Sequence, residues 1–171
     1  MKSLLYCLGI LPFALCSQPE IQWQRTLGGT EVEQANIIIQ TADKGFVVTG
    51  YTVSEDGDVV GYIGIVDVWV VKLDSVGVIH WKRVYGGSSY DVAKAIKQTF
   101  DGGYIIAGST RSNDGDVSGN HGDKDMWALK LDSNGNFLWG GAIYGPWNWA
   151  QSVKVGRNDE IYVAGNCTPG I

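Results

Sequence analysis

The sequence predicts an all-β protein built from four-stranded antiparallel sheets that repeat with a period of about 58 residues. Three tryptophans, Trp23, Trp81 and Trp139, are spaced by this period. Twenty-four glycines, seven tryptophans and only four prolines in 171 residues are typical of short strands joined by tight turns. A helical bundle would be poor in glycine, so the composition argues against a helical fold.

The repeat extends well beyond tryptophan. Shifting the chain by one period places residues 40–43 on 98–101, 56–59 on 114–117 and 72–75 on 130–133, and about half of the aligned positions are identical. Long fixed periods are typical of solenoids, propellers and other arrays of one structural unit. We therefore expect residues 18–171 to comprise repeat 1 (about 21–78), repeat 2 (about 79–136) and a partial repeat 3 (137–171).

Each period contains four strand signals. In the second repeat they are Ala93–Gln98, Tyr104–Ala107, Met126–Leu131 and Phe137–Trp139, and Ile21–Thr26 is expected to be one further outer strand. Short connections such as 132–135 make neighbouring strands antiparallel. Residues 68–73 are apolar on both faces, so each sheet needs cover on both sides. Stacking the sheets as blades of a β-propeller supplies that cover.

The chain is too short to close a propeller. It supplies one outer strand, two fuller repeats and a half-repeat, or about two and a half blades, whereas propellers typically close with four to eight. The array is therefore expected to be open and incomplete. Its remaining blades would come from a longer chain, of which this is a fragment, or from self-association, because apolar blade faces are otherwise exposed.

Residues 1–17 predict a signal peptide. Lys2 precedes an apolar run from Leu4 to Leu15, and polar residues follow from Ser17. The run is too short for a transmembrane helix, and no other stretch is apolar enough to span a membrane. The expected location is therefore secreted or at a bacterial cell surface. Residues 13–16 are also similar to a lipoprotein box, which leaves a lipid anchor at Cys16 as the alternative, although the bulky Leu15 disfavours it.

The charge of the chain excludes one class of partner. Thirteen basic and eighteen acidic residues give a net charge of −5, so there is no basic surface with which to neutralise phosphates. We expect no nucleic-acid partner. For an exported chain, the expected partners are a protein or a glycan at the cell surface.

Three motifs carry a resemblance to a known family. Residues 81–88, 101–110 and 130–135 resemble the β-propeller repeats of secreted and cell-surface bacterial proteins, notably those that Bacteroidota export. The segment with Asp132, Gly135 and Trp139 is also similar to the tryptophan-docking segment of quinoprotein propellers, although it is one residue shorter between Asp and Gly. The resemblance implies a propeller fold, but little about activity, because propellers host many functions.

The candidate chemistry is an acidic loop that occurs in both repeats. With Asp114 as position 1, Asp116, Ser118 and Asp125 stand at positions 3, 5 and 12, the spacing of an EF-hand-like calcium loop. Repeat 1 keeps the aspartates as Asp56, Asp58 and Asp67, but has Val60 at position 5. These seven side chains are the predicted Ca²⁺ ligands, and Ca²⁺ is the one cofactor suggested. The alternative is an Asp- and Gly-rich turn whose side chains bond the local backbone.

The sequence contains no recognisable catalytic constellation. Its aspartates are spread over turns, and His80 and His121 occupy different repeat positions. Trp147 and Trp149 break the repeat pattern and are the candidate ligand-binding residues, since aromatic rings in a loop stack on sugars. The predicted function is a noncatalytic exported scaffold or surface-interaction module, stabilised by Ca²⁺ if the loops bind it. The alternatives are a carbohydrate-binding propeller and the N-terminal fragment of a larger propeller enzyme.

Overall fold

A computed structural model describes residues 20–143 and 148–166, and it confirms that the chain is all-β. Ten strands and no helix occur in these residues. The strands are β1 (Glu33–Gln40), β2 (Phe46–Thr52), β3 (Asp67–Leu73), β4 (Ile79–Tyr85), β5 (Asp91–Gln98), β6 (Tyr104–Thr110), β7 (Asp125–Leu131), β8 (Phe137–Ile143), β9 (Trp149–Val155) and β10 (Ile161–Asn166). No described segment is a helix long and apolar enough to cross a membrane.

The strands form two four-stranded antiparallel sheets and one two-stranded sheet. Sheet 1 has the order β1-β2-β3-β4, sheet 2 the order β5-β6-β7-β8, and β9 pairs with β10. Each strand of sheet 2 begins one repeat period after its counterpart in sheet 1. The predicted four-stranded antiparallel repeat is therefore confirmed, and the four strand signals of the second repeat all lie within strands.

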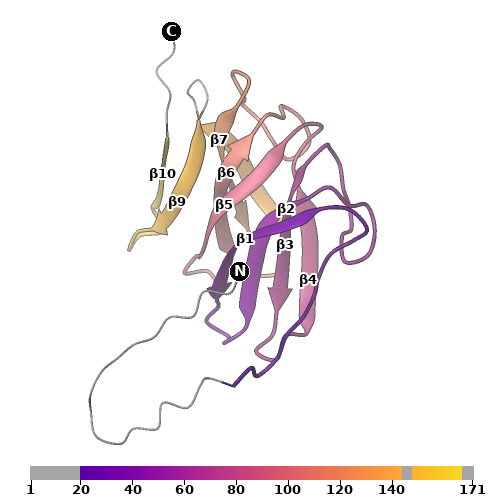
Figure 1. Cartoon of the computed structure of the whole chain (residues 1–171). Coiled ribbons are helices and arrows are strands. Elements are labelled where there is room, and N and C mark those ends of the chain that lie inside the picture. The colour runs from indigo at the N-terminus through magenta and orange to yellow at the C-terminus, as the bar shows by residue number, and fades with distance from the viewer. Residues whose placement is uncertain (1–19, 144–147, 167–171) are drawn as a thin grey trace, which may run out of the picture.

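The three sheets follow one another in chain order, face to face (Figure 1). Strand β5 packs against β1 and β2, and β9 packs against β5 and β6. In every sheet, the start of the first strand lies beside the end of the second strand. We call this end of the sheet the loop end, because the long β2–β3 and β6–β7 loops lie there. The opposite end carries the tight turns, and we call it the hairpin end.

Alternating side chains place apolar residues on both faces of sheet 2. Ile106 belongs to the core shared with sheet 1, together with Val68, Val70, Leu129 and others, whereas Ile105 belongs to the core shared with β9 and β10. Adjacent residues of a strand point to opposite faces, so both faces need a neighbouring sheet. All seven residues of β6 are buried as a result.

Trp81, in the last strand of sheet 1, docks onto sheet 2 at the hairpin end. Its ring meets Tyr104 edge-on, with 5.9 Å between ring centroids, and its Nε1 donates to the Ser133 carbonyl at 3.2 Å. The ring also lies against Gly135, where a Cβ would collide with it, and Gly135 has a φ of +76°. Only glycine combines this left-handed turn conformation with so close an aromatic neighbour.

The outer strand expected at Ile21–Thr26 is not formed, because no described strand lies beside it to supply ladder hydrogen bonds. Trp23 nevertheless repeats the Trp81 contacts one period earlier. It packs against Phe46, with ring centroids 5.7 Å apart, and donates Nε1 to the Ser75 carbonyl at 3.2 Å. The Trp23 ring thus packs onto sheet 1 as the Trp81 ring packs onto sheet 2.

Candidate functional site

The two acidic loops lie at the loop end, and the first aspartate of each loop bonds to the segment that leads into the first strand of the same sheet. Asp114 Oδ1 accepts the backbone N–H of Ser88 at 2.7 Å. Asp56 Oδ1 accepts the N–H of Thr30 at 2.8 Å, the same contact one repeat period earlier. Each carboxylate therefore fastens the segment that leads into a sheet to the long loop of that same sheet.

The middle positions of the loops bond in other directions. Asp58 forms an ion pair with Lys82 at 3.2 Å, and Asp116 Oδ2 accepts the N–H of Gly86 at 3.3 Å. Ser118 Oγ donates to the Gly140 carbonyl at 3.2 Å. These side chains reach toward neighbouring strands and not toward a common centre within the loop.

The last aspartates of the loops are buried where the third strands begin. Asp67 Oδ2 accepts the N–H groups of Ile63 and Gly64 at 2.7 and 2.9 Å, and Asp125 Oδ2 accepts that of His121 at 2.8 Å. Within the part of the chain that the structure describes, no three Asp, Glu, His or Cys side chains are grouped to hold a metal ion. Calcium binding by these loops stays a prediction.

Sequence reasoning missed Asp91, which begins β5 and is fully buried. Its Oδ2 accepts the N–H of Gly87 at 2.8 Å and the hydroxyl of Ser112 at 2.7 Å. Glu33 has the same place in sheet 1, because it begins β1 as Asp91 begins β5. Asn148 has this place in the third repeat, because it lies two residues before Ala150, which pairs with Gly165 as Ala93 pairs with Gly108. An acid or amide at one repeat position was the signal that could have drawn attention to these residues.

Asp67 and Asp91 come from successive sheets and lie close together. A parallel bridge joins Val66 to Tyr90, and the Asp91 N–H donates to the Val66 carbonyl at 2.7 Å. A Cβ on Gly86 would lie 2.5 Å from Asp67 Oδ1 and 2.7 Å from Asp91 Oδ2, so both oxygens lie close to the same side of Gly86. Burial raises the pKa of Asp67, and the negative charges of Asp91 and Asp116 raise it further, against the lowering effect of its two backbone hydrogen bonds.

Of the two candidate ligand-binding tryptophans, Trp147 lies outside the described residues. Trp149 begins β9 and is half-buried, and the Lys124 ammonium lies 5.3 Å from its ring centroid. This is a cation–π contact that occupies one face of the ring. Burial lowers the pKa of Lys124, and the positive charges of Arg111 and Lys94 add to this effect.

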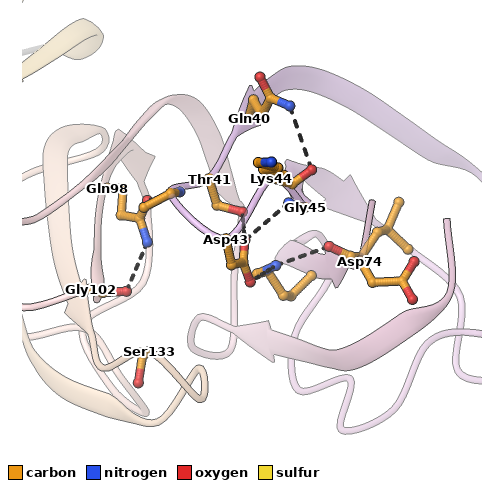
Figure 2. A network of polar contacts seen from close by, with 12 residues as sticks. Gln40, Thr41, Asp43, Lys44, Gly45, Asp74, Gln98, Gly102 and Ser133 are labelled. Atoms are coloured by element: carbon orange, nitrogen blue, oxygen red, sulfur yellow. Dashed lines mark hydrogen bonds and ion pairs between the residues drawn. The ribbon is translucent and has the colours of Figure 1, made fainter. Parts of the chain in front are cut away.

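At the hairpin end, a polar network lies beside a cleft between sheets 1 and 2 (Figure 2). Asp43 accepts hydrogen bonds from Thr41 Oγ1 and Gly45 N, and pairs with the buried Lys72 at 2.8 Å. The Lys72 ammonium, followed by the Thr41 hydroxyl, holds the pKa of Asp43 far below its usual range. Asp101 and Lys130 repeat this arrangement in sheet 2.

The cleft has a volume of about 350 Å³. Trp81 and Tyr104 form its apolar part, and the polar lining includes His80, Gln98 and Asn134. Gln98 also accepts the Ala42 N–H at 2.9 Å, a bond that joins the two sheets. The volume is at the lower end of the range for small-ligand sites.

No protein-family model matches this chain, and no curated protein sequence matches it.

Proposed function

We propose that this chain is a segment of an exported β-propeller that serves as a noncatalytic scaffold or surface-interaction module. The observation that carries the proposal is the tryptophan docking that recurs with the repeat. Trp23 and Trp81 reach Ser75 and Ser133 through identical 3.2 Å hydrogen bonds. The first joins the segment before sheet 1 to sheet 1, and the second joins sheet 1 to sheet 2. Face-to-face stacking of four-stranded sheets with one fixed junction is the packing that blades of a propeller require.

The use of the repeated polar residues supports a structural role. Asp56 and Asp114 bond the backbone of the preceding segment, and Asp43 and Asp101 neutralise buried lysines. A catalytic site needs one set of residues, whereas these contacts occur once per repeat. The location outside the cell rests on the signal-peptide pattern at residues 1–17, and the family resemblance supports it.

The experiment that tests this proposal is a measurement of the intact mass of the native product from the source cells and their medium, followed by light scattering on the purified protein. We expect a mass well above 18.5 kDa, or a chain of this mass that self-associates. A larger mass would also direct a search for enzymatic activity to the additional residues. A monomer slightly lighter than 18.5 kDa would contradict the propeller proposal, because about two and a half blades cannot close a propeller without further blades.

Glycan binding is the second candidate, and the cleft between the first two sheets favours it. An aromatic edge together with His80, Gln98 and Asn134 offers apolar contact and hydrogen bonds to hydroxyl groups. If the cleft binds sugars, retention on glycan arrays should fall at least tenfold in Asn134→Ala. If Trp147 and Trp149 bind sugars instead, retention should fall at least tenfold in Trp147→Ala or Trp149→Ala. Equal retention by all three variants and the wild type would reject this function.

A further inference from the structure

The junction between sheets 1 and 2 contains two carboxylates with incomplete partners. Asp67 and Asp91 are both 0% exposed. Each uses Oδ2 for two hydrogen bonds, while Oδ1 of each is buried without a hydrogen-bond partner among the described residues. A buried carboxylate oxygen without a donor is costly, and two in adjacent side chains indicate that something else satisfies them.

Among the described residues, no basic side chain forms an ion pair with either carboxylate. The ion pairs formed by residues 20–143 and 148–166 engage Asp43, Asp58, Asp101 and Asp123, and none includes Asp67 or Asp91. Asp116 adds a third carboxylate nearby, since its Oδ2 accepts the N–H of Gly86, the residue that Asp67 and Asp91 both approach. Burial, the largest effect, raises the pKa of Asp67 in spite of its two backbone hydrogen bonds. The junction therefore gathers carboxylates in a buried place where this part of the chain supplies no counter-charge.

We propose that Asp67 and Asp91 together bind a divalent cation of the Ca²⁺ type, which clamps sheet 1 to sheet 2. Hard divalent cations prefer oxygen ligands, and both orphaned oxygens are carboxylate oxygens. The remaining ligands are oxygens of the backbone, of hydroxyl groups or of water. This site differs from a calcium loop because its two carboxylates come from successive repeats, and it goes beyond the proposed scaffold function.

The next junction supplies an internal comparison. There the buried Asp125 begins β7, and Asn148 takes the place of Asp91. The Asn148 N–H donates to the Lys124 carbonyl at 2.9 Å, just as the Asp91 N–H donates to the Val66 carbonyl. One amide in place of a carboxylate removes a full negative charge, so the second junction should bind the cation more weakly.

The test is thermal unfolding of the full chain in CaCl₂, MgCl₂ or EDTA, compared among wild type, Asp91→Asn, Asp114→Asn and Asp125→Asn. We expect about 1 mM Ca²⁺ to raise the wild-type Tm by about 5 °C over EDTA, because a ligand that binds only the folded state stabilises it. Asp91→Asn should lose most of this gain and bind Ca²⁺ at least tenfold more weakly. Asp114→Asn, in the loop, and Asp125→Asn, at the other junction, should keep it.

A measurement on the wild type covers the case in which Asp91→Asn does not fold. Ca²⁺ should slow amide hydrogen exchange at residues 63–67 and 87–91 more than at 113–125. Three outcomes overturn the proposal: a Tm that is equal in Ca²⁺ and EDTA, a gain lost in Asp114→Asn but kept in Asp91→Asn, and protection confined to 113–125. An Asp91→Asn variant whose Tm exceeds that of the wild type by the same amount in Ca²⁺ and in EDTA would overturn it too, because it would favour a proton shared by the two carboxylates. None of these outcomes changes the mass measurement that tests the propeller.

Discussion

At the residue scale, repeated aspartates perform two different tasks in this fold. Asp43 and Asp101 are half-exposed and neutralise lysines that are almost completely buried. The Lys130 ammonium, followed by the Thr99 hydroxyl, lowers the pKa of Asp101 to about 2. Asp67 and Asp91 are instead fully buried, with no basic partner in the described chain. Burial and the available counter-charge, rather than residue type, decide what each carboxylate does.

Replacing Asp101 tests the buried-lysine contact. In Asp101→Asn the Lys130 ammonium loses its carboxylate, and we expect a loss of about 1 kcal/mol in the free energy of unfolding at pH 7, since solvent screens the half-exposed pair. The same change at Asp123, whose pair with Arg111 is 4.0 Å apart and exposed, should cost less than about 0.5 kcal/mol. Urea unfolding followed by tryptophan fluorescence measures both.

The pH dependence of this loss has a defined sign. A lowered pKa means that the folded protein keeps Asp101 ionised where the unfolded chain already binds a proton. The contribution is therefore complete above about pH 4 and is lost as the pH falls toward 2. The difference between wild type and Asp101→Asn should shrink over that interval. A difference that stays constant from pH 7 to pH 2 would contradict the ion pair.

At the scale of the strands, the last strand of one sheet fastens the next sheet. Trp81 on β4 contacts Tyr104 and the turn at Ser133 and Gly135, all in sheet 2. Trp139 on β8 has the same repeat position but is 45% exposed. The same residue type in the same place therefore has two environments, because Trp81, unlike Trp139, meets a turn of the next sheet among the described residues.

This difference predicts unequal effects of two matched substitutions. Trp81→Ala should lower the free energy of unfolding by about 3 kcal/mol, because it removes an aromatic contact, a hydrogen bond and buried apolar surface. Trp139→Ala should cost less than about 1 kcal/mol, because its ring is already half-exposed. Chemical denaturation of both variants measures the effects. Equal losses would show that Trp81 is not a junction residue.

At the scale of the whole molecule, cover on both faces decides which sheet is most stable. Sheet 2 lies between sheet 1 and the β9–β10 pair, and its strand β6 is buried throughout. Strand β10 has only β9 as its ladder partner among the described strands, and most of its residues are exposed. A two-stranded sheet is marginally stable by itself and depends on the neighbour it packs against.

Hydrogen exchange should reveal this gradient. Amides of β6 (Tyr104–Thr110) should exchange roughly 100-fold more slowly than those of β10 (Ile161–Asn166), since only β6 is paired on both edges and covered on both faces. Exchange followed by mass spectrometry measures the ratio. Association with further four-stranded sheets should protect β10 and leave β6 unchanged. Equal protection of β6 and β10 in the isolated monomer would contradict this stability order.

The sequence by itself determined the repeat, the strands and the turns, because alternation of apolar side chains and turn residues act over a few neighbouring positions. Every strand of sheet 2 accordingly begins one repeat period after its counterpart in sheet 1. The unpaired segment at Ile21–Thr26 was predicted as a strand because its pattern is local, whereas a ladder needs a partner. Only the tertiary structure decided which carboxylates meet. Loop spacing grouped Asp114 with Asp125, but stacking of the sheets brings Asp67 to Asp91, because a junction joins residues that no local pattern connects.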